Sequence, residues 1–238
     1  MVLRPYGPVV RDDHPPFSYP DYRATVKRAP RSDLVSILQT LSETTGPGPG
    51  WSEVSEEDSD LTSNAGTGAA AIGERIIVTG RVSDEMGRGI PRTLIEIWQA
   101  NAAGRYVHWR DTEFDAPLDP NFLGVGRCIT DEQGDYRFVT IKPGAYPWRN
   151  HFNAWRPAHI HFSLMGPSLG SRLVSQMYFP DDPLLDHDPI YTSVPAHARE
   201  RLLARYDRAV TEEAWALGYR WDIVLRGSAA TPGEDGEG

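Results

Sequence analysis

The sequence predicts an all-β protein, with a β-sandwich core of mixed strands, long loops, an N-terminal arm and one or two short helices. Short segments rich in β-branched and aromatic residues follow one another, and turns rich in Asp and Gly separate them. In addition, residues 158–164 alternate between polar and apolar side chains, as a half-buried strand does. Both observations favour strands packed in layers over a helical or a doubly wound fold.

Seven segments have the composition of strands. They are residues 75–82, 93–99, 126–130, 136–141, 159–164, 172–179 and 220–225. Residues 84–87 and 131–135 are predicted turns, because Asp bonds to nearby backbone and Gly accepts a positive φ. One short helix is expected to begin at residues 32–33, with an apolar stripe within 34–41. A second is expected to begin at residues 193–195, with its stripe within 202–210.

Composition excludes several classes of protein. The chain has 238 residues, a net charge of −9 and a pI near 5.2, so a phosphate-binding surface for nucleic acid is not expected. Residues 53–60 and the tail from Glu234 concentrate acidic side chains and are interpreted as solvated loops. The single cysteine, Cys128, is interpreted as a buried structural thiol and fits a reducing cytoplasm. Neither a signal peptide nor a membrane span is recognisable, so we expect a cytoplasmic protein.

The most informative motif is the pair His159 and His161. In a strand the two side chains point to the same face, with Cβ atoms roughly 7 Å apart, so both rings can reach one metal ion. Ile160, Phe162 and Leu164 then form the opposite, core-facing side. From the spacing alone, a metal site and an ordinary hydrogen-bonded pair of sheet histidines are equally supported.

Two other metal-dependent classes share a His-x-His strand. A cupin requires a Glu three or four residues after the second histidine, where this chain has Leu164 and Met165. A hydrolytic zinc site requires a third ligand. The candidates for that ligand lie in loop-like segments that enforce no geometry: His151, Asp186 and His187. Neither class gains support, although a zinc hydrolase and a non-enzymatic sandwich subunit both remain alternatives.

Two tyrosines in distinctive contexts, Tyr106 and Tyr146, suggest a different metal. Ionising a phenol of ordinary pKa at neutral pH costs about 4 kcal/mol, and a hard, highly charged cation offsets that cost better than zinc or ferrous iron does. If both phenols reach the metal, two tyrosinates and one hydroxide would neutralise Fe(III). Such a site would be strongly coloured.

Four ordered segments together resemble the intradiol ring-cleavage dioxygenases. They are residues 98–106 (WQANAAGRY), 117–122 (PLDPNF), 141–150 (IKPGAYPWRN) and 155–162 (WRPAHIHF). The resemblance extends from about Tyr6 to Gly227, and the ordered set is far more specific than any one segment. Catechol and hydroxyquinol members of this family carry an additional N-terminal helical region. The single short helix expected before the strands here favours the protocatechuate branch.

The resemblance implies a ligand set and a pocket. Tyr106, Tyr146, His159 and His161 match the iron ligands, with Tyr146 as the labile axial ligand opposite His161. Tyr146, Arg156 and Gln176 match residues with catalytic roles. Arg156, Trp148 and Ile190 match residues that bind the substrate, and Trp98 fits the hydrophobic wall. Residues 107–116 are one residue longer than the family pattern and residues 151–154 are variable, which bears on substrate preference.

The resemblance also implies an activity and partners. A non-haem Fe(III) enzyme would cleave protocatechuate (3,4-dihydroxybenzoate) with O2 to 3-carboxy-cis,cis-muconate, in the β-ketoadipate pathway of aromatic catabolism. A related α subunit would complete the active site within a larger (αβ)n oligomer, with no nucleic acid or membrane partner. Residues 1–72 would be an arm, short helix and long loop for subunit contacts. Residues 73–227 would be the catalytic β-sandwich, and 228–238 a disordered acidic tail.

Overall fold

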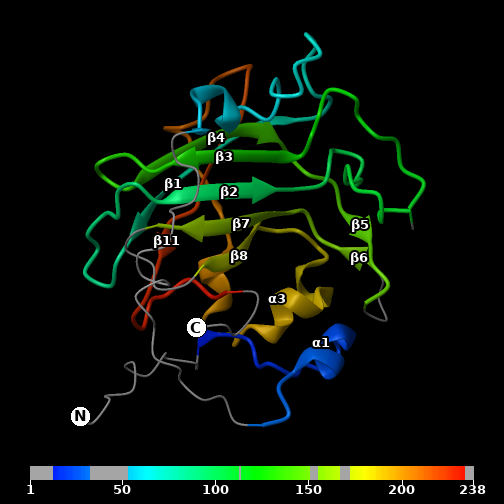
Figure 1. Cartoon of the computed structure of the whole chain (residues 1–238), viewed down its shortest axis with the longest axis vertical. Helices are drawn as coiled ribbons and strands as arrows, with labels where there is room; N and C mark the ends of the chain where they lie inside the picture. Colours follow the sequence, from blue (N-terminus) through cyan, green and yellow to red (C-terminus); the bar gives the residue numbers. More distant parts are fainter. Residues whose placement is uncertain (1–12, 33–52, 113, 151–154, 167–171, 234–238) are drawn as a thin grey trace.

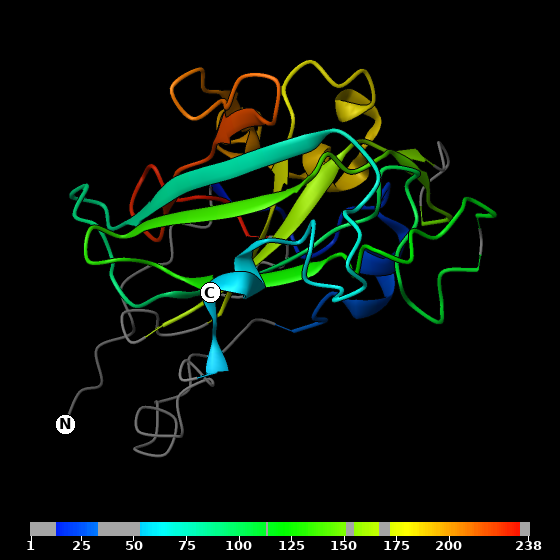
Figure 2. The ribbon, with the colours of Figure 1, turned by 90° about the horizontal axis from the view of Figure 1, so that it is seen from above.

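Two β-sheets face each other across a hydrophobic core in the computed structural model of the chain (Figure 1). The structure describes residues 13–32, 53–112, 114–150, 155–166 and 172–233. Seen from above, the strands cross the middle of the molecule, and the loops and short helices lie around them (Figure 2). The predicted all-β sandwich is therefore confirmed.

The first sheet is mixed. Its strands are β1 (Arg75–Ser83), β4 (Asp135–Ile141), β9 (Arg205–Tyr206), β10 (Leu217–Arg220) and β11 (Ile223–Val224). β1 pairs antiparallel with β4 and parallel with both β10 and β11. The two expected turns also form: Gly87 and Gly134 have φ values of 75° and 82°, and their amides donate to the carbonyls of Asp84 and Asp131.

The second sheet is antiparallel and has the order β3-β2-β7-β8. Its strands are β2 (Leu94–Trp98), β3 (Val125–Ile129), β7 (His159–Met165) and β8 (Leu173–Tyr178). A separate two-stranded ribbon joins β5 (Tyr146–Pro147) to β6 (Trp155–Arg156), close to the ends of β7 and β2 (Figure 1). The boundaries of β2, β3, β7 and β8 agree with the predicted segments to within one residue at each end.

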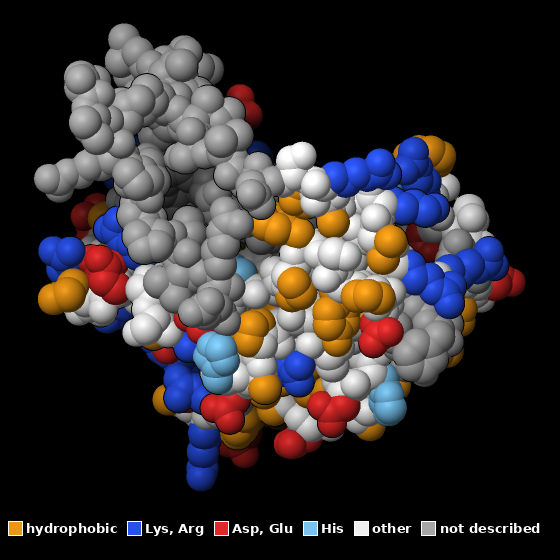
Figure 3. All heavy atoms as spheres, turned by 90° about the horizontal axis from the view of Figure 1, so that it is seen from below, with side chains coloured by type: hydrophobic (Ala, Val, Ile, Leu, Met, Phe, Trp, Pro, Cys, Tyr) orange, Lys and Arg blue, Asp and Glu red, His pale blue; other side chains and the backbone are white. Residues whose placement is uncertain are grey.

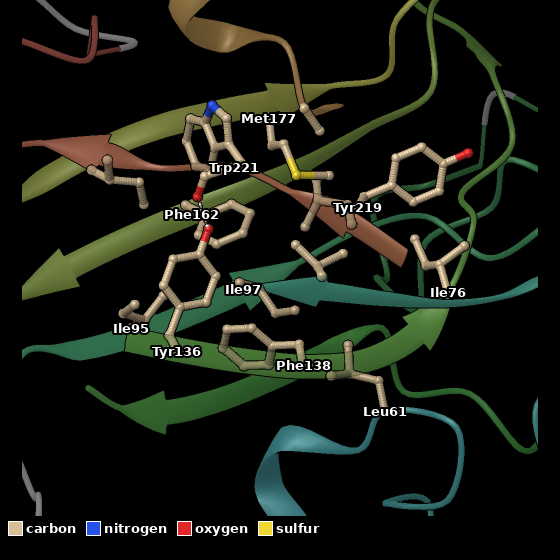
Figure 4. Packing of buried hydrophobic residues seen from close by; sticks show 14 of the residues in the cluster. Leu61, Ile76, Ile95, Ile97, Tyr136, Phe138, Phe162, Met177, Tyr219 and Trp221 are labelled. Carbon is tan, nitrogen blue, oxygen red and sulfur yellow. Dashed lines mark hydrogen bonds between the residues drawn. The ribbon is translucent and has the colours of Figure 1, made fainter. Parts of the chain in front are cut away.

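Apolar side chains from both sheets interdigitate to form the core (Figure 4). Phe162 on β7 lies 4.7 Å from Trp221 and 5.9 Å from Tyr136, measured between ring centroids. Ile97 and Phe138 are also buried in this cluster. Each sheet thus contributes one apolar face, which leaves the other face of β2, β7 and β8 available for polar chemistry.

In the part of the chain that the structure describes, helices are short and lie outside the sheets. They are α1 (Arg23–Arg28), α3 (Pro189–Ser193) and the 3-10 helices η3 (Glu56–Ser59), η4 (Leu185–His187) and η5 (Arg199–Leu202). α1 and α3 lie at the same end of the molecule, below β8 in Figure 1. The face seen from below mixes hydrophobic, acidic and basic side chains (Figure 3). No helix in the described ranges is both long and apolar enough to cross a membrane.

The predicted helix beginning at residues 193–195 is wrong. α3 ends at Ser193, and the chain continues through η5 into β9. The amide of Ala204 donates to the carbonyl of Tyr178, and Leu203 forms an isolated parallel bridge with the same residue. Pairing with the edge of β8 therefore overrides the helical spacing of the apolar residues. The helix expected within residues 34–41 lies outside the described residues.

Two expected loops are also more ordered than predicted. Within residues 53–60, η3 packs beside β3, where Asp58 Oδ2 accepts from Arg127 Nε at 2.9 Å. The following residue, Leu61, is fully buried. In the tail, residues 228–233 are not a disordered segment: the Thr231 amide donates to the carbonyl of Val224, and Thr231 is buried. Residues 234–238 lie outside the described part of the chain.

Candidate metal centre and active site

β7 places both histidines on the outer face of the second sheet, opposite the core. Its apolar residues point inward, as the alternation predicts. The strand register sets His161 between Trp98 on β2 and Gln176 on β8. The rings of Trp98 and His161 are stacked, with centroids 4.7 Å apart and an interplanar angle of 4°. The ring of Trp98 therefore forms one wall beside the histidines.

The two tyrosines reach the same place from different loops. Tyr106 follows a turn at Gly104, whose φ is 79°. A Cβ on Gly104 would lie 2.2 Å from the carbonyl oxygen of Ala145, so glycine allows the two tyrosine-bearing segments to pack closely. The Tyr106 amide donates to Asp111 Oδ2 at 2.7 Å, and Tyr146 pairs with Arg156 in the ribbon of β5 and β6.

The structure brings all four rings together. The Tyr106 and Tyr146 centroids are 5.3 Å apart, and those of His159 and His161 are 4.9 Å apart. Tyr146 lies 5.5 Å from His159, and Tyr106 lies 6.5 Å from His161. Tyr146 Oη is 3.2 Å from His159 Nε2. The four predicted ligand residues thus form one cluster on the outer face of the sheet.

His159 has the protonation state that a metal ligand needs. Its Nδ1 donates to the carbonyl of Pro157 at 2.7 Å, which leaves the lone pair on Nε2. Burial, followed by the positive charge of Arg156 and the neighbouring His161, holds the pKa of His159 well below its ordinary value. The imidazole is therefore neutral, and its basic nitrogen faces the tyrosine cluster.

The donor set distinguishes between metals. In the described ranges no three His, Cys, Asp or Glu side chains gather into a metal-binding group. Asp186 and His187 are exposed around η4, and His151 lies outside those ranges, so the structure shows no third ligand for a hydrolytic zinc site. Two phenols and two imidazoles on one face instead fit a hard, highly charged cation such as ferric iron.

Arg156 lies beside this cluster in a buried polar network. Nη1 is 3.3 Å from Tyr146 Oη and 3.0 Å from His159 Nε2. Nη2 donates to Gln176 Oε1 at 2.6 Å and to Asp188 Oδ2 at 2.7 Å. Burial opposes the positive charge, but the carboxylate of Asp188 and, after it, Tyr146 and Tyr178 together outweigh burial, so the pKa of Arg156 is raised well above its ordinary value. The structure therefore buries a permanent cation next to the four rings.

The remaining predicted residues differ in their distance from the rings. Trp148 lies under the guanidinium of Arg156, whose carbon is 5.2 Å from the indole centroid. Gln176 contacts Arg156, and its Nε2 atom is buried with no hydrogen-bond partner. Ile190, on α3, is linked to the network through Asp188 Oδ1, which accepts from its amide at 3.1 Å. Its side chain lines a small cavity with Gln176 and Tyr178.

Sequence reasoning missed two members of the network, Asp188 and Tyr178. Tyr178 Oη contacts Gln176 Oε1 at 2.9 Å and Asp188 Oδ2 at 3.0 Å. The signals for them were local: Asp188 precedes Pro189, as an N-cap does, and Tyr178 follows Gln176 by two residues on one strand. Neither signal indicates which residue such a side chain contacts.

Comparisons with known proteins agree with this geometry. A family profile described as "Dioxygenase" matches residues 47–227, and one described as "Protocatechuate 3,4-dioxygenase beta subunit N terminal" matches residues 10–40. The chain is 58% identical to the protocatechuate 3,4-dioxygenase beta chain of Burkholderia cepacia, over 93% of this chain and 94% of that protein. It is 26% identical to the alpha chain from the same organism, over 83% and 98% of the two chains.

A solved structure shares the fold. The 3-chlorocatechol 1,2-dioxygenase of Rhodococcus opacus 1CP superposes with a TM-score of 0.56 at 22% identity, covering 92% of this chain and 81% of that chain. At this identity the likeness shows the fold alone. The profile match and the beta-chain similarity extend over most of the sequence and include all four clustered rings. The chain therefore belongs to the intradiol ring-cleavage dioxygenase family.

Proposed function

We propose that this chain is the iron-bearing subunit of an enzyme that cleaves protocatechuate with O2 to 3-carboxy-cis,cis-muconate, a reaction of the β-ketoadipate pathway. The observation that carries the proposal is the convergence of Tyr106, Tyr146, His159 and His161 beside a buried guanidinium. The similarity to a protocatechuate 3,4-dioxygenase beta chain supports the choice of substrate. Residues 73–227 form the catalytic domain in this proposal.

The four side chains would hold Fe(III). When bound, ferric iron supplies Lewis-acid activation that makes a chelated catechol ring reactive toward O2. His159 offers Nε2, because Nδ1 is engaged by the Pro157 carbonyl. Tyr106 has a buried hydroxyl oxygen, which would be its ligand atom. These residues fix the position of the site from three different segments of the chain.

Tyr146 and Arg156 have the more active roles. The Tyr146 oxygen would accept a proton from a catechol hydroxyl as the substrate binds, and it lies 3.3 Å from Arg156 Nη1. Nη1 then faces the place where negative charge accumulates on the substrate ring. A fixed, buried cation such as Arg156 stabilises such charge without rearranging.

Residues around the cluster shape the pocket. Trp148 is packed between Arg156 and Tyr22 of the N-terminal arm. The ring centroids of Tyr22 and Trp148 are 5.2 Å apart. Trp98 covers His161 from the opposite strand. Gln176 acts through Arg156, to which its side-chain oxygen is bonded. Ile190 would contribute to the wall through the position of α3.

A related α subunit would complete the pocket in an (αβ)n oligomer. The loop after Tyr106 supports this proposal, because it exposes large apolar side chains: Val107 is 53% and Trp109 76% exposed. Trp155 on β6 is 42% exposed and lies 5.8 Å from the ring of Phe114 in that loop. Apolar surface of this kind beside an active site is typical of a subunit contact.

Oxygen uptake tests the proposed activity. The chain, co-expressed with its α partner and loaded with iron, should consume one O2 per protocatechuate and yield the ring-opened tricarboxylic product. Catechol and hydroxyquinol, which lack the carboxylate, should react far more slowly. Iron-loaded protein that leaves protocatechuate unchanged would contradict the proposal, and faster turnover of catechol would move the chain to another branch of the family.

A further inference from the structure

One carboxylate, Asp188, organises the buried network behind Arg156. Its Oδ2 accepts from Arg156 Nη2 at 2.7 Å and from Tyr178 Oη at 3.0 Å. Its Oδ1 accepts from Arg156 Nε at 3.3 Å and from the amide of Ile190 at 3.1 Å. The side chain is fully buried, and these four donors occupy the acceptor capacity of a carboxylate.

The contacts of Asp188 determine which part of Arg156 faces the four rings. Two contacts, through Nε and Nη2, fix the guanidinium plane, because a planar fork held at two nitrogens cannot rotate freely. The nitrogen left over, Nη1, is the one that lies 3.3 Å from Tyr146 Oη and 3.0 Å from His159 Nε2. Nη2 also contacts Gln176 Oε1 and Tyr178 Oη, both of which are uncharged groups.

The same carboxylate also positions α3. Asp188 is the N-cap of this helix, with Pro189 at the first helical position. The amide of Ile190, the proposed pocket residue, therefore donates to Asp188 Oδ1, the same atom that accepts from Arg156 Nε. A single side chain links the orientation of the cation to the position of the pocket wall.

We propose that Asp188 is a positioning residue of the active site: it orients the Arg156 guanidinium so that Nη1 faces the ligand cluster, and it ties this orientation to α3. The proposal rests on the proposed dioxygenase function for its kinetic consequences only. Its structural content, the direction of Nη1, is independent of any activity.

Asp188→Asn separates orientation from folding. Asn is an N-cap as good as Asp, so α3 keeps its first turn. However, the amide NH2 replaces one acceptor oxygen and the negative charge, so the fork loses its charged partner. A matched control is Asp84→Asn, because Asp84 is also buried, also caps a turn and also bonds an arginine, Arg88. It lies in the turn after β1, away from the four rings.

In iron-loaded Asp188→Asn we expect kcat per bound iron to fall about 10- to 100-fold, more than KM rises, with iron content per chain unchanged. Asp84→Asn should keep the wild-type kcat. In an Arg156→Gln background, Asp188→Asn should change kcat by less than about twofold, because Asp188 acts through Arg156. An unchanged kcat in the single variant, or an equal loss in both backgrounds, would overturn the proposal.

A crystal structure of iron-free Asp188→Asn supplies a readout that needs neither activity nor a stable Arg156→Gln protein. Arg156 Nη1 should leave its position within hydrogen-bonding distance of Tyr146 Oη and His159 Nε2. An unmoved guanidinium would overturn the proposal. If the wild-type enzyme failed to consume protocatechuate, the proposed function would fall, while the direction of Nη1 in the variant would still decide the role of Asp188.

Discussion

At the scale of residues, the two clustered tyrosines are not equivalent. The Tyr146 oxygen contacts Arg156 Nη1 and His159 Nε2, whereas the Tyr106 hydroxyl oxygen is buried. An oxygen beside a fixed cation is suited to exchange protons, and a buried oxygen is suited to a permanent ligand. The structure therefore predicts different consequences for the loss of each phenol.

Tyr146→Phe should retain iron but lower kcat about 100-fold, because it removes the group that accepts the catechol proton. Tyr106→Phe should lose iron on dialysis. Metal analysis and oxygen uptake measure the two effects, with Tyr206→Phe as a control at an exposed phenol. Wild-type turnover by Tyr146→Phe would refute the role assigned to Tyr146.

Cys128 gives a prediction about pH. Burial raises the pKa of its thiol to about 12, whereas a thiol in the unfolded chain has a pKa of about 8.5 to 9. The unfolded state therefore releases a proton first, and the folded state loses stability as pH rises from about 9 toward 12. Between pH 9 and 10 the expected loss is about 1 kcal/mol.

Urea unfolding at pH 8 and pH 10 tests this prediction against Cys128→Val, which has no thiol to titrate. Wild type should lose about 1.5 kcal/mol more than the variant over that interval. Equal pH dependence of the two unfolding free energies would show that the thiol is ionised equally easily in both states.

The sequence predicts the site unevenly at this scale. Alternation in β7 is sufficient to place His159 and His161 on the polar face, because a strand has a fixed period of two. Two other contacts join residues that are distant in the chain: Tyr106 and Tyr146 are 40 residues apart, and Arg156 and Asp188 are 32 residues apart. No local periodicity encodes such contacts, so the family resemblance supplied the first and nothing supplied the second.

At the scale of elements, the predicted strand 220–225 divides into β10 and β11 around Trp221. The Trp221 amide donates to the carbonyl of Thr79, and its own carbonyl accepts from Tyr136 Oη at 2.6 Å. A Cβ on Gly80 would lie 1.8 Å from that carbonyl oxygen. The interruption between β10 and β11 thus requires a glycine in the middle of β1. A glycine inside a strand often marks such a close approach of another backbone segment.

Gly80→Ala should destabilise the protein by about 3 kcal/mol or more, because the clash is with backbone in a packed core. Gly87→Ala is the control: nothing lies within 4 Å of its added Cβ, and only its positive φ makes it unfavourable, by about 1 kcal/mol. Thermal unfolding measures both. A smaller loss for Gly80→Ala than for Gly87→Ala would contradict the close approach of Trp221.

The other errors at this scale have the same physical origin. Residues 202–210 have helical spacing, but the edge of β8 offers backbone partners, and a parallel bridge forms with Tyr178 instead. Residues 53–60 are acidic, yet Asp58 accepts a hydrogen bond from Arg127 on β3, which lies 69 residues further along the chain. Strands and turns could be predicted because their signals are local, whereas these segments are determined by partners distant in sequence.

At the scale of the whole molecule, the N-terminal arm and the C-terminal tail meet. Asp13 is bonded to His197 Nε2 at 2.6 Å and to Arg201 Nη1 at 3.0 Å. Arg201 in turn donates to the carbonyl of Ala230, and the Gly233 amide donates to His14 Nδ1. The arm continues to α1, which bonds to Asn150 close to Trp148. Residues 13–28 of the arm therefore contact residues 230–233 at one point and Asn150 at another.

Asp13→Asn should loosen this contact and destabilise the protein by about 1–2 kcal/mol at neutral pH. Burial alone would raise the pKa of Asp13. The hydrogen bonds and charges of Arg201 and His197 have a larger effect in the opposite direction, so the pKa of Asp13 lies below its ordinary value. The stabilisation is thus present above about pH 4 and is lost as pH falls through the native-state value.

Unfolding midpoints of wild type and Asp13→Asn should accordingly differ at pH 7 and approach each other near pH 3. Asp21→Asn, a change at an exposed carboxylate on the same arm, should match wild type at both. A gap of constant size across this range would mean that the charge of Asp13 contributes nothing to the contact.

The visible absorption spectrum of the protein co-expressed with its α partner tests the proposed ferric bis-tyrosinate centre most directly. After iron loading we expect a broad tyrosinate-to-Fe(III) band, and we expect that band to shift when protocatechuate is added without oxygen. A protein that remains colourless after iron reconstitution would contradict the ferric site and return His159 and His161 to zinc binding or to a structural role.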